Sequence, residues 1–285
     1  MALADAFTPE SAPASRGASK PAPRRIAARV SAETATAGRL EVRQFATELE
    51  LDGDRLTLAP LTFQLFGGRY QGTLRATLGT SLNATLQSRI SDLDAAELAA
   101  FGGVAGAVTG RLTGAATFTG SGSDLTAILR NARGNGTAGI VEGSIAKLGL
   151  VRTVVLFFGR PAPETPAASD RFDRLDARFT LANQVVTGQA LALQSRDTDV
   201  VGTGTLDVAT TALDAAVDLS LSEELSAQAG TDLRRYTREG NRIVLPAHVG
   251  GTLSAPRLTI DAGAALQRGL QNEVERRLKG LLDGF

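Results

Sequence analysis

Few residues in this sequence could carry out catalysis or bind a metal ion. The 285 residues include no cysteine and a single histidine, His248, which excludes thiolate sites and imidazole clusters. A histidine acting as a general base needs a nucleophile and an orienting carboxylate, and the sequence contains no G-x-S-x-G elbow to supply a serine. We therefore expect His248 to be a polar strand residue, and we expect no catalytic residue, no metal site and no cofactor.

One glycine-rich segment has the spacing of a nucleotide-binding loop. Residues 134–139 read GNGTAG and fit G-x-G-x-x-G. A dinucleotide site requires this loop to follow a buried strand and to open a helix. Here the preceding residues have a helical pattern, and the sequence from Ile140 onward has the pattern of a strand. The order of elements is therefore reversed, and we expect these glycines to occupy turn and strand positions.

The composition narrows the function classes further. Thirty basic and thirty acidic residues give a formal charge of +0, whereas nucleic-acid binders usually carry a basic excess, so we expect no nucleic-acid partner. Hydrophobic residues make up 43% of the chain, enough for a packed core. No apolar run approaches the roughly 18 residues of a membrane-spanning helix. Residues 1–29 lack the apolar core of a signal peptide and are rich in Pro, Ala and Ser, which predicts a disordered linker.

The strongest pattern is alternation of apolar and polar residues, which is typical of strands with one buried face. It extends over residues 45–51, 61–65, 70–78, 82–87, 108–119, 175–181, 202–208 and 213–221. Asp52-Gly53 is a hairpin signal, and Gly67-Gly68 interrupts the next run. Short turns between such strands predict an antiparallel meander.

Helical patterns are short and few. Residues 91–101 begin like a capping box, Asp124 could cap a helix that reaches residue 132, and residues 145–158 and 225–236 have helical features. Residues 262–285 carry one apolar stripe and predict a C-terminal amphipathic helix. Because a sheet must bury its apolar face, and these helices would cover only part of it, we predict a mainly β domain over residues 30–261. Its long, curved antiparallel meander would form an open apolar groove.

The alternation also predicts which residues line that groove. The groove candidates are Leu74, Leu82, Leu112, Leu206, Val217 and Leu219. The neighbouring polar residues should face water, and they are Arg75, Asn83, Arg111, Asp207 and Asp218. A register slip of one residue would exchange the two sets.

The order of these segments resembles the C-terminal region of the AsmA family. The segments that carry the resemblance are LTLAPLTFQLFGGRYQGTL, ISDLDAAELAAF, GRLTGAATFTGSGSDLTAILRNARGNGTAGIVEGSI, FDRLDARFTLANQVVTGQALALQSRDTDVVGTGTLDV and IVLPAHVGGTLSAPRLTI. Each motif by itself consists of glycines and alternation, but their order and spacing together are fairly specific. The resemblance covers about residues 30 to 285.

The resemblance implies a bacterial envelope protein that is not an enzyme. Members of this family are related to TamB-type lipid-transfer proteins and are anchored in the inner membrane by an N-terminal helix. A long periplasmic β-groove is thought to carry phospholipids toward the outer membrane. The implied partners are phospholipid acyl chains, the membrane and other envelope proteins, and the implied location is the periplasm, with the anchor outside this chain. The alternative is a scaffolding envelope module whose groove is filled by its own helices.

Overall fold

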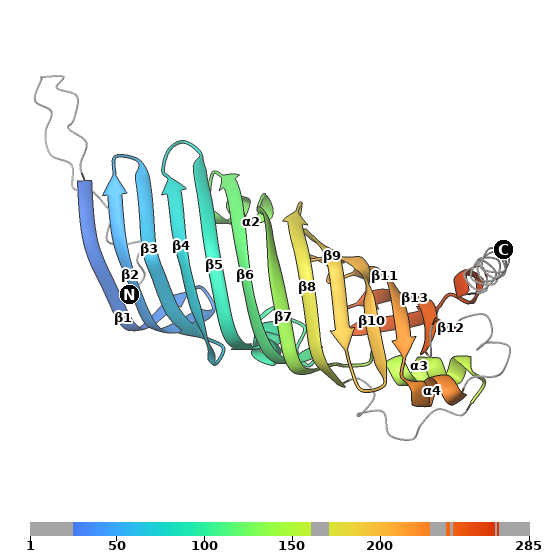
Figure 1. Ribbon diagram of the computed structural model, residues 1–285. Helices are drawn as coiled ribbons and strands as arrows, with labels where there is room; N and C mark the ends of the chain where they lie inside the picture. Colours follow the sequence, from blue (N-terminus) through green and yellow to red (C-terminus); the bar gives the residue numbers. More distant parts are fainter. Residues whose placement is uncertain (1–24, 161–170, 229–237, 240–241, 266, 268–285) are drawn as a thin grey trace, which may run out of the picture.

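The computed structural model describes residues 25–160, 171–228, 238–239, 242–265 and 267. Its main feature is one open sheet in which almost every strand lies beside its neighbour in the sequence (Figure 1). The strand order is β1-β2-β3-β4-β5-β6-β7-β8-β9-β10-β11-β13-β12, and β14 pairs with β13. All of these pairs are antiparallel. The prediction of a mainly β antiparallel meander is confirmed.

Most strands contain one of the predicted alternating runs and are longer than that run. The strands are β1 (Arg25–Ala37), β2 (Leu40–Asp52), β3 (Arg55–Leu65), β4 (Gly68–Thr77), β5 (Leu82–Asp94), β6 (Val108–Gly122), β7 (Arg133–Ile145), β8 (Arg171–Ala182), β9 (Val185–Gln194), β10 (Thr198–Asp207), β11 (Leu213–Leu221), β12 (Arg238–Glu239), β13 (Arg242–Thr252) and β14 (Ala255–Ile260). The helices are α1 (Ala95–Phe101), α2 (Leu125–Arg130), α3 (Leu150–Phe157) and α4 (Glu223–Gln228).

Strand structure begins earlier than the sequence pattern indicated. β1 starts at Arg25, so residues 25–29 of the predicted linker belong to a strand. Arg25 pairs with Asp52 and Ile26 with Leu51 in the β1–β2 ladder. The backbone of this edge strand is ordered by pairing with β2, a long-range interaction that local composition does not reveal.

The predicted turns lie where glycine is needed. β2 ends at Asp52 and β3 begins at Arg55, and Gly53 between them has φ +61°. Gly67, between β3 and β4, has φ +69°. Because L-residues other than glycine rarely adopt positive φ, these two glycines permit the tight reversals that keep consecutive strands adjacent.

Four of the predicted helical segments contain a helix, and α1, α2 and α3 are shorter than their sequence patterns. α4 overlaps the beginning of the predicted 225–236 segment, and residues 229–236 lie outside the described part of the chain. Asp94 caps α1 by accepting a hydrogen bond from Ala96 N at 2.8 Å, and Asp124 caps α2 by accepting one from Ala127 N at 2.8 Å. α3 forms the second half of the predicted 145–158 segment. The glycines of residues 134–139 lie within β7, after α2, as we expected from the order of elements.

The predicted C-terminal helix lies almost entirely outside the described residues. Its beginning is described, where Asp261 Oδ1 accepts a hydrogen bond from Ala264 N at 2.9 Å. Among the helices that the structure describes, none has the length and apolar character required to cross a bilayer.

The main core lies at the C-terminal end of the sheet. There α3 and α4 lie near β11 and β13 (Figure 1), and their apolar side chains join those of the last strands in one cluster. Val154 of α3, Leu219 of β11 and Leu245 of β13 are completely buried in it. A smaller cluster at α1 contains Leu93, Ala95 and Leu112. The sheet is therefore covered unevenly.

Candidate functional site

The strand register assembles one row of mostly apolar residues across most of the sheet. We call it the apolar row, and its members, in strand order from β2 to β11, are Leu49, Leu58, Leu74, Leu86, Phe118, Gly134, Leu181, Val186, Leu206 and Leu213. Each is the direct cross-strand partner of the next. All are half-buried. Nine strand spacings of about 4.8 Å give the row a length of roughly 40 Å.

Aromatic rings pack on two glycines of this face. A Cβ on Gly134 would lie 2.4 Å from Cδ1 of Phe118, and one on Gly136 would lie 2.9 Å from Cζ of Phe179. Each ring therefore covers a glycine of the neighbouring strand β7. Such pairing buries ring surface and protects the glycine backbone, so it contributes to the partial burial of these side chains.

All six groove candidates lie on the face that carries the apolar row, which we call the apolar face. Leu74 and Leu206 belong to the row itself, and Leu82 lies on the same side of β5 as Leu86. The predicted face of these residues is therefore confirmed.

Their exposure divides the six into two groups. Leu74, Leu82 and Leu206 are half-buried, whereas Leu112, Val217 and Leu219 are 9%, 8% and 0% exposed. Leu112 is covered in the α1 cluster, and the other two lie in the α3–α4 core. The expectation that all six line an open groove is corrected in this respect, because helices bury three of them.

The five polar residues predicted to face water lie on the opposite side, the polar face. Arg75, Asn83 and Arg111 are exposed, and Asp207 and Asp218 are half-buried. Asp207 is held at the end of β10, where it accepts a hydrogen bond from Thr210 N at 2.7 Å. This backbone hydrogen bond lowers the pKa of Asp207.

Four hollows on the sheet surface are lined mainly by the polar face, and none of them contains a groove candidate. Two have volumes of about 700 Å³ and 1090 Å³. Arg75 and Arg133 line the first, and Arg133 and Arg178 line the second. The alternation predicts that Arg75 faces water, but it does not predict that arginines of several strands gather in these hollows. The signal was an arginine at a polar position of several successive strands.

His248 forms an acid–base pair on the polar face. Its Nε2 lies 2.8 Å from Oδ1 of Asp214, and both side chains are exposed. No serine or threonine hydroxyl of the described residues is hydrogen-bonded to the imidazole ring. A histidine–aspartate pair without a nucleophile has no acyl-transfer chemistry of its own. The hydrogen bond between His248 and Asp214 is a cross-strand contact that links β11 and β13.

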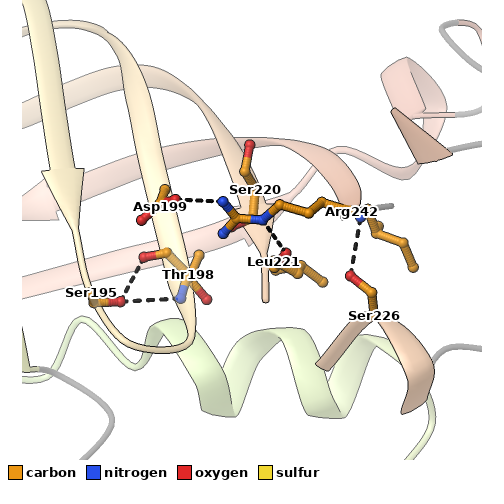
Figure 2. A network of polar contacts seen from close by, with 8 residues as sticks. Ser195, Thr198, Asp199, Ser220, Leu221, Ser226 and Arg242 are labelled. Carbon is orange, nitrogen blue, oxygen red and sulfur yellow. Dashed lines mark hydrogen bonds and ion pairs between the residues drawn. The ribbon is translucent and has the colours of Figure 1, made fainter. Parts of the chain in front are cut away.

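A polar network holds the C-terminal core together (Figure 2). Arg242 of β13 donates to the carbonyl oxygen of Leu221 at 2.7 Å, to that of Ser220 at 3.0 Å and to Asp199 Oδ2 at 2.7 Å. Ser226 Oγ of α4 accepts from Ile243 N at 3.1 Å. One guanidinium therefore connects β13 to β10 and β11, and one hydroxyl connects β13 to α4.

Comparisons of the chain with protein-family models, with curated proteins and with solved structures found no match.

Proposed function

We propose that this chain is a non-enzymatic protein of the bacterial envelope that binds phospholipid acyl chains along the open part of the apolar face. The supporting observation is the apolar row, whose side chains stay partly accessible across β2 to β11. The described helices contact the sheet mainly at β5, β6, β13 and β14, so long stretches of the row have no helix above them. An apolar sheet face that stays partly accessible to solvent can bury its remaining surface against an apolar partner.

The dimensions and energetics suit acyl chains. A row of roughly 40 Å exceeds the ~30 Å hydrocarbon thickness of a whole bilayer. One acyl chain could thus occupy several successive positions along it. Burial of each CH₂ contributes about 0.8 kcal/mol, so a sixteen-carbon chain gains on the order of 10 kcal/mol on a continuous apolar surface.

The resemblance to the AsmA family supports the same proposal. It implies a periplasmic protein, associated with the inner membrane, that passes phospholipid toward the outer membrane. Movement along the face requires uninterrupted apolar contact, because each exposed methylene loses its burial energy. The row provides such contact from Leu49 of β2 to Leu213 of β11.

The alternative is a scaffolding envelope module that fills its own apolar face. The observation in its favour is the extent of internal covering: α3 and α4 close the C-terminal core, and a Cβ on Gly120 would lie 2.8 Å from the Ile128 side chain of α2. In this alternative the remaining row is stabilised by ring–glycine packing and needs no ligand.

Two experiments distinguish these functions. First, lipids extracted from the purified chain are identified by mass spectrometry. Second, a benzophenone amino acid replaces Leu74, and phospholipid crosslinking is measured with and without Leu206→Asp. The matched control is Thr205→Asp, which adds the same charge to the exposed polar face of β10.

We expect phospholipid to copurify and to crosslink at position 74. Leu206→Asp should reduce the crosslink severalfold, since a carboxylate interrupts the apolar surface, and Thr205→Asp should leave it unchanged. A folded protein that carries no phospholipid and gives no crosslink would support the scaffolding alternative instead.

A further inference from the structure

Three of the polar-face hollows adjoin one another, and we call them together the trough. The first and second hollows share Thr119 and Arg133 in their linings. The second and third, of about 1090 Å³ and 790 Å³, share Arg89 and Arg178. The trough therefore runs across the polar face from β3 to β9, on the side of the sheet opposite to the apolar row.

The trough is strongly basic although the chain as a whole is neutral. Its arginines, which we call the arginine trough residues, are Arg55, Arg75, Arg89, Arg111, Arg133, Arg174 and Arg178. The acidic lining residue is Asp176, which is paired with Arg174. The other six arginines are exposed and make no ion pair with any residue that the structure describes.

The fourth hollow adjoins the trough, because it shares Thr57 with the first, and it is lined by two acidic residues. Glu48 and Glu50 pair with arginines of β1 at one edge of the sheet. Asp199 is paired with Arg242 and Asp214 with His248 near the other end. The three hollows of the trough thus hold seven arginines and one acidic residue, although the formal charge of the whole chain is +0. Like charges gathered on one face repel one another unless a counter-charge is present.

The residues between the arginines indicate which kind of anion fits. They are hydroxyl and amide side chains: Thr57, Thr77, Asn83, Thr85, Gln71, Gln87, Thr117, Asn135 and Thr137. These groups donate to and accept from sugar hydroxyls, and guanidinium groups bind carboxylates and phosphates in bidentate fashion. Phe179 is the one aromatic residue among those that line the three hollows, and its ring lies on the opposite, apolar face, where it packs against Gly136. The trough therefore offers no aromatic platform on which bases could stack.

We propose that the arginine trough binds an acidic polysaccharide, with its charged groups on the arginines and its hydroxyls on the Thr, Asn and Gln side chains. A polymer matches the site because the positive charges are spread over six strands rather than gathered in one pocket. This inference concerns the polar face and does not depend on lipid binding by the apolar face.

The test measures binding of polygalacturonate, a carboxylated glycan, to the full chain at several salt concentrations. Neutral dextran of similar length and an oligodeoxythymidylate of similar total charge are the comparison probes. The test variant combines Arg75→Gln, Arg133→Gln and Arg178→Gln. The control variant combines Arg130→Gln, Arg152→Gln and Arg257→Gln, which removes the same charge from exposed positions outside the trough.

We expect polygalacturonate to bind at about 50 mM salt and to weaken steeply as salt is raised, because counterions are released on binding. The trough variant should bind roughly tenfold more weakly with a shallower salt dependence, and the control variant should bind like the wild type. Absence of polygalacturonate binding, equal losses in both variants, or tighter binding of the oligonucleotide would each overturn the proposal.

Discussion

Leu74 of β4 and Leu206 of β10 lie in one transverse row of the sheet, linked through direct cross-strand partners on β5, β6, β7, β8 and β9. Two residues distant in sequence thus contribute to one surface. β11 carries Leu213 of the row near its beginning and Leu219, which is completely buried in the α3–α4 core, further along the same face. The same apolar face is therefore a surface at one end and a closed core at the other.

This division predicts opposite outcomes for two identical substitutions. Leu219→Asp places an unpaired carboxylate in a closed core and should destabilise the protein by at least about 3 kcal/mol. Leu206→Asp, on the half-buried row, should leave the protein folded, since the carboxylate can stay partly hydrated. Circular dichroism melts measure both, and Thr205→Asp should change little. Unfolding of both leucine variants would mean that the row is also closed.

The ring–glycine contacts predict a cost for adding a methyl group. Gly134→Ala would place Cβ 2.4 Å from the Phe118 ring and 2.5 Å from the carbonyl oxygen of Thr117, so it should cost about 1–3 kcal/mol through overpacking. The matched control is Gly139→Ala on the same strand, where the nearest atom is a side-chain oxygen of the half-buried Asp176 at 3.1 Å. Urea unfolding should show a much smaller change for the control, and equal losses would contradict the packing explanation.

Arg242 should stabilise the folded protein through the planar geometry of its guanidinium group as well as through its charge. Arg242→Met leaves two strand-end carbonyls without their donor and should cost about 1–3 kcal/mol. Arg242→Lys should rescue little, because one ammonium cannot reach three separate acceptors in the planar geometry of a guanidinium. Asp199→Asn tests the ion pair alone and should have a small effect, since both partners are partly exposed. Thermal unfolding measures the loss of stability in the three variants, which should be large for Arg242→Met and Arg242→Lys and small for Asp199→Asn.

Thr198 offers a substitution that should stabilise the protein. The residue is completely buried, and its Oγ1 makes no hydrogen bond among the described residues. Thr198→Val replaces this hydroxyl with a methyl group of similar size and should raise the free energy of unfolding by about 1 kcal/mol. Thr198→Ala should lower it by leaving a small cavity. A lower melting temperature for the valine variant would indicate that the hydroxyl has a partner.

The capping of α2 should depend on pH. Hydrogen bonding from Ala127 N lowers the pKa of Asp124 below its ordinary value of 3.8. Because the folded state binds the proton less readily, the capping contribution is fully present above about pH 3.8. It is lost as the pH falls through the lower folded pKa.

Amide hydrogen exchange in residues Leu125–Arg130 measures this loss. Exchange of these amides, corrected for the intrinsic pH dependence, should rise below about pH 3.8 in the wild type. Asp124→Asn keeps an oxygen acceptor but does not titrate, so its exchange should not show this step. A step of the same size in Asp124→Asn would assign the change to another group.

Some features could be predicted because they depend on neighbouring residues alone. The alternation in 70–78 and 213–221 placed Leu74 and Val217 on the correct face, since successive side chains of a strand point to opposite sides. Asp94 and Asp124 marked helix starts because an N-cap requires only its own side chain and the following amides.

Other features depended on the pairing of strands. β-bulges in the β3–β4 and β5–β6 ladders place Leu58 with Leu61, and Ile90 with Leu93, on one face although the members of each pair are three positions apart, an offset that would otherwise put them on opposite faces. The start of β1 at Arg25 depends in the same way on its partner β2.

The sequence by itself thus determined the two faces of each strand, because side-chain direction is a local property of the backbone. Only the tertiary structure decided which part of the apolar face is closed. Leu219 is buried by α3, which is distant from it in the sequence, and by α4, which follows its strand. It also decided that Arg75, Arg133 and Arg178 line adjoining hollows. Register across strands sets such neighbours, and register depends on every turn and bulge between them.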